Sequence, residues 1–244
     1  MISVANFARQ SLLLVLCGGA IGVLGYAMIN DPKPSSLQAP VAFNFPQNVP
    51  LPDANISATQ PLAAKDKVGA GQSYRYTVPP QPSSGTSKSV AGKPQVIDLE
   101  IRYITDGVSN RPTMDAMLPM FNNIPAKVVL APSTMKEQPG LGFYSLFVDK
   151  KTVYFGTCIN PRGITTVTGD QFQANSNPNP FGGGVPFQRF IPWVLGKQTF
   201  RDSRCLWTVL STPIDEAAPD ATIKTLQTVG INWARWWQGN FPPG

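Results

Sequence analysis

The segment TCINPRGITTVT, residues 157–168, brings a cysteine, an amide and an arginine together in Cys158, Asn160 and Arg162. A thiol becomes a good nucleophile when a positioned base or a positive neighbour favours its thiolate. The chain contains no histidine, so Cys158 lacks the usual base, and neither a Ser-His-Asp triad nor an imidazole metal site can form. The remaining activator is an arginine, Arg162 or Arg204, which would make Cys158 a redox or acyl-transfer site.

The cysteines favour pairing over catalysis or metal binding. Cys17 stands in the hydrophobic N-terminal segment, which leaves too few cysteines for a cysteine-rich zinc site, and we expect no metal and no cofactor. Cys158 and Cys205 stand at the ends of predicted strands, a common position for a structural bridge in an exported domain. We therefore predict a disulfide between them, with two free thiols as the alternative.

Residues 11–29 predict a membrane-directed N-terminus. The stretch is uncharged, and as a helix it would be about 28 Å long, close to the thickness of a bilayer core. Arg9 precedes it, which favours a cytoplasmic N-terminus and a single-pass plasma-membrane protein with its C-terminal domain in the periplasm. The alternative is a cleavable signal peptide, cut near Ala27, and a secreted protein.

Glycines at helical spacing could give this segment a docking face. Gly18, Gly22 and Gly25 fall on one side of the helix, and Gly18 and Gly22 form a GxxxG pair that lets another helix approach closely. Glycine is also common in membrane helices in general, so the pair has a second explanation.

Residues 30–94 read as a linker rich in proline, serine and glycine. Prolines recur every few residues, and no period of 2 or 3.6 is sustained. Within this stretch, residues 73–78 alternate like a short strand. We expect the folded body to begin near Gln95 and to occupy residues 95–244.

The body predicts an α+β domain with a mainly antiparallel sheet and a C-terminal helix. Strands are expected at 96–104, 127–131 and 204–212, and a hairpin over 140–159.

Three helices are expected in the same body. One follows Thr168, with Gly169 or Asp170 near its cap, and a second covers 189–196. The longest runs from Pro219 to about Gln238. Its core-facing side chains share one face at helical spacing and are Ile223, Leu226, Trp233 and Trp237, with Lys224 and Arg235 outside.

The charge balance limits the partners. A net charge of +6 and a pI near 9.3 favour an anionic surface, either lipid headgroups or an acidic polysaccharide. Nucleic acid is not expected, because no run of lysines or arginines and no known binding signature is present. The tryptophans at 193, 207, 233, 236 and 237 could form a sugar-stacking platform, but core packing explains Trp207 and Trp233 more simply.

Three segments carry a family resemblance: TCINPRGITTVTGDQFQANSN, RFIPWVLGKQTFRDSRCLWTVLSTPID and WARWWQGNFPP. They resemble the cyanobacterial proteins known as cyanoexosortase A system-associated proteins, over roughly residues 95–243. The resemblance implies one membrane segment, an exported domain and a non-enzymatic role beside an exosortase. That partner is a transpeptidase-like membrane enzyme that processes proteins with a C-terminal sorting signal in organisms making extracellular polysaccharide. The catalytic residues would belong to the partner.

The same resemblance marks candidate contact residues. Arg162 is the first choice, because an arginine on a tight turn can offer its planar fork to a carboxylate. The full set of partner-contact candidates is Asn160, Arg162, Arg201, Arg204 and Trp236. Residues 178–188 depart from the expected pattern, since they form a longer, glycine-rich segment to which we assign no role.

Overall fold

The computed structural model describes residues 17–19, 22, 43–64, 70–80, 93–104, 114–161, 163–176 and 204–242. Spatial contacts divide the chain into two units, residues 1–39 with 178–202, and residues 40–177 with 203–244. Of the first unit only Cys17–Gly19 and Gly22 are described, and these residues are helical and exposed.

The second unit is built from one sheet and four helices among its described residues. The strands are β1 (Asn55–Leu62), β2 (Gly71–Val78), β3 (Gln95–Ile104), β4 (Met135–Gln138), β5 (Gly142–Asp149), β6 (Thr152–Ile159), β7 (Thr165–Thr166) and β8 (Cys205–Pro213). The helices are α2 (Met114–Asn122), α3 (Ala126–Val129), α4 (Gly169–Ser176) and α6 (Pro219–Gly239).

All eight strands join one sheet in the order β1-β2-β3-β8-β6-β7-β5-β4. Every pairing is antiparallel except the single contact between β5 and β7. The predicted α+β class, the mainly antiparallel sheet and the C-terminal helix are thus confirmed.

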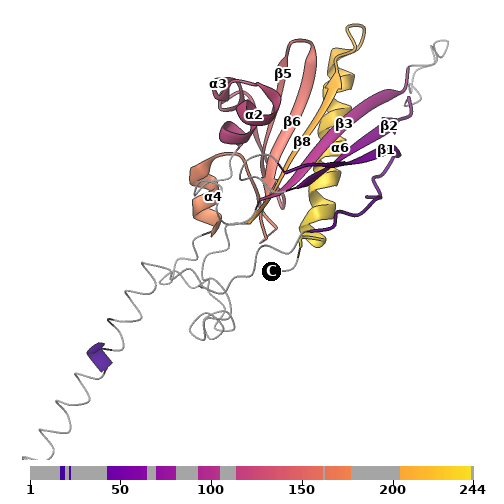
Figure 1. Cartoon of the computed structure of the whole chain (residues 1–244). Helices are drawn as coiled ribbons and strands as arrows, with labels where there is room; N and C mark the ends of the chain where they lie inside the picture. The colour runs from indigo at the N-terminus through magenta and orange to yellow at the C-terminus, as the bar shows by residue number, and fades with distance from the viewer. Residues whose placement is uncertain are drawn as a thin grey trace, which may run out of the picture. The chain divides into compact units, whose positions relative to one another are not determined.

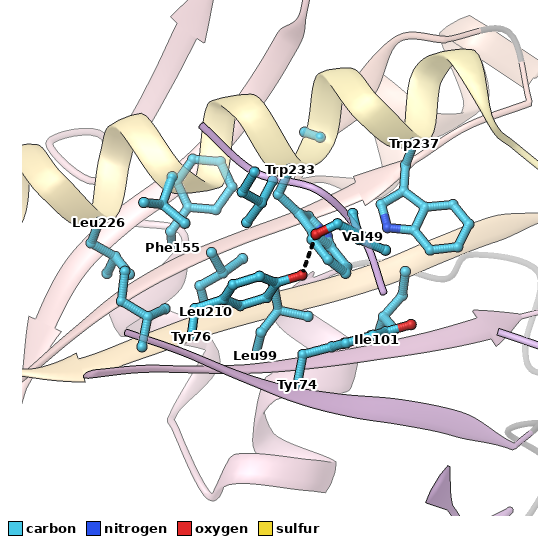
Figure 2. Packing of buried hydrophobic residues seen from close by; sticks show 14 of the residues in the cluster. Val49, Tyr74, Tyr76, Leu99, Ile101, Phe155, Leu210, Leu226, Trp233 and Trp237 are labelled. Atoms are coloured by element: carbon cyan, nitrogen blue, oxygen red, sulfur yellow. Dashed lines mark hydrogen bonds between the residues drawn. The ribbon is translucent and has the colours of Figure 1, made fainter. Parts of the chain in front are cut away.

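Helix α6 covers one face of the sheet (Figure 1). Alternate residues of the strands point to it, and its own buried stripe includes Leu226, Trp233 and Trp237, as predicted. Figure 2 shows these side chains directed at the sheet, where Phe155 lies below the helix. Ile223 is half-buried against the same core, while Lys224 and Arg235 are exposed. Gly230 permits this approach, because a Cβ there would lie 2.6 Å from the Phe155 ring.

The opposite face carries a second apolar cluster beneath α2, α3 and α4. Its centre is Trp207 of β8, whose ring lies 5.2 Å from that of Phe121 in α2. Met114 and Phe172 bring α2 and α4 into the same cluster. Two cores on opposite faces explain why β8, which lies between them, is buried along most of its length.

Several predicted elements are confirmed. Strands occur where residues 73–78, 96–104 and 204–212 predicted them, and β5 and β6 form the hairpin predicted over 140–159. Lys150 and Lys151 both have positive φ, 45° and 64°, as a two-residue hairpin turn that follows the twist of its strands requires. The helix after Thr168 is α4.

Helix α4 begins at Gly169, so Gly169 and Asp170 lie next to its cap, as predicted. Thr168 accepts the backbone N–H of Gln171 at its hydroxyl, 3.3 Å away, and the Gln171 side chain accepts the backbone N–H of Thr168 at 3.1 Å. This reciprocal pair is a capping box. The capping residue itself is Thr168.

The expected linker is partly wrong, because the fold begins well before Gln95. Strands β1 and β2 complete the sheet, and residues 43–51, which we call the strap, pack on the core under α6. Val49 is fully buried, and its carbonyl accepts the Tyr76 hydroxyl at 2.8 Å (Figure 2). Tyr74 donates to the carbonyl of Pro46 at 2.7 Å. Residues 43–64 and 70–80 belong to the domain.

The strand predicted at 127–131 is also wrong. Ala126–Val129 form the single turn of α3, preceded by Pro125 with φ −61°. Val129 is buried, whereas Val128 is only partly buried. The apolar residues of this short segment therefore pack from a helical turn and not from a strand of the sheet.

Other predictions lie mainly outside the described residues. These are the membrane segment 11–29 apart from its four helical residues, the helix at 189–196, the glycine-rich segment 178–188, and Gly25. Within the part of the chain that the structure describes, no helix is long and apolar enough to cross a membrane.

Candidate functional site at the disulfide end of the sheet

Cys158 and Cys205 form a disulfide, as predicted, with 5.7 Å between their Cα atoms. Antiparallel pairing places Cys158 opposite Trp207, so Cys205 is its diagonal neighbour on the same face. Both cysteines are fully buried. A bridged, buried sulfur cannot act as a resting thiolate nucleophile, and the alternative of two free thiols does not match this structure.

The turn after Cys158 is held from within. The carbonyl of Asn160 accepts the N–H of Gly163 at 2.9 Å, and the N–H of Asn160 reaches the carbonyl of Ile164 at 3.2 Å. Gly163 has φ 81°, a conformation that glycine adopts without strain. The backbone therefore explains the glycine at position 163.

Gln238, near the end of α6, hydrogen-bonds to the turn that follows Cys158. The side-chain amide of Gln238 donates to the carbonyl of Gly163 and to that of Leu141, the latter at 3.2 Å. The same Leu141 carbonyl accepts the N–H and the hydroxyl of Thr165 at 2.8 and 3.0 Å. Gln238 thus joins the end of the last helix to two loops that are distant in sequence.

Arg204 makes a third connection at the same end. Its Nη1 donates to the hydroxyl of Tyr103 and to the carbonyl of Pro242, each at 3.2 Å. Its guanidinium also lies 5.6 Å from the centre of the Phe241 ring. Arg204 therefore fastens the C-terminal residues to β3 and β8.

The strap enters the domain beside this connection. The ring of Phe43 lies 5.6 Å from that of Tyr103 and 6.1 Å from that of Trp237. The start of the strap therefore lies against the end of β3 and the last turn of α6. Described parts of the three segments that carry the family resemblance converge on this end of the sheet.

The predicted contact residues have different places in this site. Asn160 is 3% exposed, so it serves the turn and offers little surface to a partner. Arg204 is half-buried within the bonds described above, and Trp236 is half-buried, with its ring 4.8 Å from that of Trp237. Arg162 and Arg201 lie outside the described residues.

Among the described residues, three tryptophans are buried, which agrees with the core packing expected for Trp207 and Trp233 and not with a sugar-stacking platform. Trp207, Trp233 and Trp237 are each at most 1% exposed, and Trp193 lies outside the described ranges. Trp233 donates its indole N–H to the buried hydroxyl of Thr208 at 3.0 Å. Core packing is the role of these three residues.

The sequence did not predict a role for two residues at the disulfide end of the sheet, Arg102 and Gln238. Arg102 is 6% exposed, pairs with Glu100 at 2.6 Å and donates to the carbonyl of Ala63 at 3.0 Å. Its guanidinium carbon also lies 4.3 Å from the centre of the Phe121 ring. Arg102 binds the carbonyl of Ala63, and Gln238 binds those of Leu141 and Gly163; no local pattern reveals these contacts.

The titratable side chains of the described residues were compared with the needs of a metal site and of acid–base catalysis. In the described ranges, no group of three or more acidic or cysteine side chains could hold a metal ion. Burial raises the pKa of Tyr74 and Tyr76 well above their ordinary value, and for Tyr74 the neighbouring Tyr76 adds to the effect. Both tyrosines remain protonated hydrogen-bond donors at neutral pH.

The fold and this site define a disulfide-bridged α+β domain whose antiparallel sheet is covered by a C-terminal helix. Comparison with models of protein families, with curated proteins and with solved structures finds no match.

Proposed function

We propose that this chain is a non-enzymatic, membrane-anchored accessory protein of an exosortase-type protein-sorting system. Its partner would be an integral membrane enzyme of that kind, or the proteins that this enzyme processes. The proposal places the domain outside the plasma membrane, on a single N-terminal helix, where a disulfide is stable. It rests on the residues that resemble the cyanoexosortase A system-associated proteins.

One structural observation carries the non-enzymatic part of the proposal. Cys158 and Cys205, the two cysteines of the domain, are buried and bonded to each other. The chain has no histidine that could activate a serine or cysteine. The cysteine-dependent acyl-transfer alternative therefore lacks its nucleophile in the oxidised protein.

A second observation supports a contact role for the disulfide end. The segments that carry the resemblance meet there, and Gln238 and Arg204 fix them to one another. These bonds give the disulfide end one fixed arrangement, which a contact surface needs. The candidate partner contact remains Arg162, on the turn between Pro161 and Gly163.

Affinity purification from detergent-solubilised membranes tests the proposal, with the full chain as bait. We expect the wild-type protein to retain a polytopic membrane enzyme. Replacing Gly18 and Gly22 together with Leu should weaken this association, because a bulky side chain prevents close helix approach. Gly19→Leu is the matched control, since Gly19 lies on another side of the helix.

Arg162→Ala tests the second contact separately. It should leave membrane insertion unchanged and reduce binding of an acidic partner surface, since a charge-assisted hydrogen bond contributes about 1.5–3 kcal/mol. If the mature protein begins near Met28 and the Gly18 and Gly22 variant behaves like wild type, the segment is a signal peptide. The anchor must then be abandoned in favour of a secreted protein.

A further inference from the structure

The chain contains a single sequence of the form Asn-x-Ser or Asn-x-Thr in which x is not proline. It is Asn55-Ile56-Ser57, at the start of β1. Oligosaccharides are attached to the asparagine amide of such sequences in exported proteins, where the sequence lies at the surface. Because so short a motif also arises by chance, its structural setting has to show that it can serve as an acceptor.

Asn55 is accessible in the folded domain. Its side chain is exposed and makes no hydrogen bond with the other described residues. It follows a tight turn in which Asp53 has φ 59°, and β2 is the one strand that pairs with it among those described. A group attached to the amide nitrogen of Asn55 would therefore displace no contact of the described domain.

Ser57, the hydroxyl residue of the motif, stands in an irregular part of β1. It is exposed, and its hydroxyl donates to the carbonyl of Arg75 at 3.1 Å. The pairing with β2 shifts register between Ile56 and Ala58, which leaves Ser57 without a partner residue. A bulge of this kind bends a strand and interrupts its ladder. Because an edge strand with an interrupted ladder opens more easily than a central one, the acceptor segment can enter the site of an enzyme.

A free carboxylate lies two residues before the acceptor. Asp53 is exposed, and the ion pairs of the described residues do not include it. A carboxylate in this place can bind a cationic side chain of an enzyme, and charge-assisted bonds fix the position of a substrate. Residues 53–57 thus offer a carboxylate, an amide and a hydroxyl on one exposed segment.

The two edges of the sheet differ in their protection against pairing with other molecules. At one edge, β4 has four residues, which include Lys136 and Glu137. At the other edge, β1 has eight residues and no charged side chain. Proteins block such edges with charges, prolines, bulges or covering groups. Pro61 and the bulge at Ser57 interrupt the later part of β1, and a bulky hydrophilic group on Asn55 would block its start.

We propose that Asn55 is a site of N-linked glycosylation and that the glycan covers the start of the exposed β1 edge. The donor is an oligosaccharide joined to a lipid through pyrophosphate, and a membrane-bound transferase is the catalyst. The amide nitrogen of Asn55 forms a bond to C1 of the first sugar, and the bond between C1 and the pyrophosphate oxygen breaks. The lipid pyrophosphate leaves, and the amide gives one proton to a base of the transferase. The proposal rests on the export of the domain, which is part of the proposed function.

Mass spectrometry of the full chain, purified in detergent from the cells that naturally produce it, tests the proposal. We expect an excess mass of whole sugar residues on the peptide that contains Asn55. Asn55→Gln and Ser57→Ala should each abolish this excess, whereas Ser57→Thr should retain it because threonine keeps the hydroxyl. Asn48→Gln is the matched control and should keep the full excess, since Asn48 is an exposed amide without Ser or Thr two residues later.

The state of Cys158 and Cys205 reports export separately, because a disulfide is stable in an oxidising compartment. If the two cysteines are bonded and the Asn55 peptide has its unmodified mass, the glycosylation proposal is overturned and the exported accessory role is unaffected. If the cysteines are reduced and the peptide is unmodified, both proposals are overturned. A glycan that persists in the Asn55→Gln variant also overturns the assignment to Asn55.

Light scattering of the same purified proteins tests the covering role. Asn55→Gln removes the glycan and should self-associate more than wild type, because the start of β1 is then free to pair. Asn55→Lys also lacks the glycan but places a charge on the edge, so it should self-associate less than Asn55→Gln. Equal self-association of wild type, Asn55→Gln and Asn55→Lys would overturn the covering role.

Discussion

Trp233 on α6 donates its indole N–H to the hydroxyl of Thr208 on β8, with 3.0 Å between nitrogen and oxygen. Both residues are fully buried, and Trp233 also packs edge-on against Tyr74, at a ring distance of 5.2 Å. A single side chain thus fixes the C-terminal helix to the centre of the sheet and to β2. The contact with Tyr74 also joins the last helix of the domain to one of its first strands.

Replacing Trp233 with Ala should therefore lower the free energy of unfolding by about 3–5 kcal/mol, as expected for a large buried aromatic residue. Urea denaturation of the full chain measures the change. Trp236→Ala is the control, because Trp236 is only half-buried and should contribute less. If Trp233→Ala costs under about 1 kcal/mol, the helix is not held as described.

Thr208→Val tests the hydrogen bond of the same pair. Valine has a similar shape, but it leaves the buried indole N–H without an acceptor, which costs about 1–3 kcal/mol. The double variant Trp233→Phe with Thr208→Val removes both polar groups. In a double-mutant cycle, we expect it to be less destabilised than the sum of the single variants.

The disulfide should contribute strongly to stability. Cys158 and Cys205 are 47 residues apart, and in the chain-entropy model a loop of this length corresponds to about 4 kcal/mol. The double variant Cys158→Ala with Cys205→Ala should lose stability of this order, whereas Cys17→Ser should not. In the unfolded, unreduced protein only Cys17 should react with a thiol reagent, and a second reactive thiol would contradict the bridge.

The sequence predicted those elements whose signals are local. The hairpin β5–β6 follows from two apolar runs around Lys150 and Lys151, and α6 follows from a hydrophobic stripe at helical spacing. Each pattern is complete within about 20 residues, so no distant contact is needed to recognise it. The disulfide could be anticipated because the domain offers only two cysteines.

The strap could not be predicted in the same way. Prolines and polar residues separate the few apolar residues between Phe43 and Leu51, so the segment lacks the sustained pattern of a strand or helix. Its backbone is held by the hydroxyls of Tyr74 and Tyr76, about 27 residues away. Helix α2 was missed for a related reason, since Pro119 interrupts its sequence pattern. Among the site residues, Gln238 and Arg102 gave no local signal, because both bind backbone carbonyls of distant loops.

The strap gives a direct test of where the domain begins. Val49→Ala should cost about 1.5–3 kcal/mol of stability, because Val49 is fully buried in the main core. Asn48→Ala should change stability by less than about 0.5 kcal/mol, since the neighbouring side chain is exposed. Equal and negligible effects at both positions in urea denaturation would mean that residues 43–51 are a linker after all.

The two strap-binding tyrosines predict a loss of stability at high pH. Burial raises the pKa of Tyr74 and Tyr76 above their ordinary value of about 10. Their contribution is therefore fully present below about pH 10. As the pH rises further, the unfolded chain loses two protons that the folded protein keeps, so unfolding becomes easier by at most about 2.7 kcal/mol per pH unit. The double variant Tyr74→Phe with Tyr76→Phe should show a flatter dependence in urea denaturation between about pH 9 and 11. An equal slope in the variant and the wild type would show that other groups cause the alkaline transition.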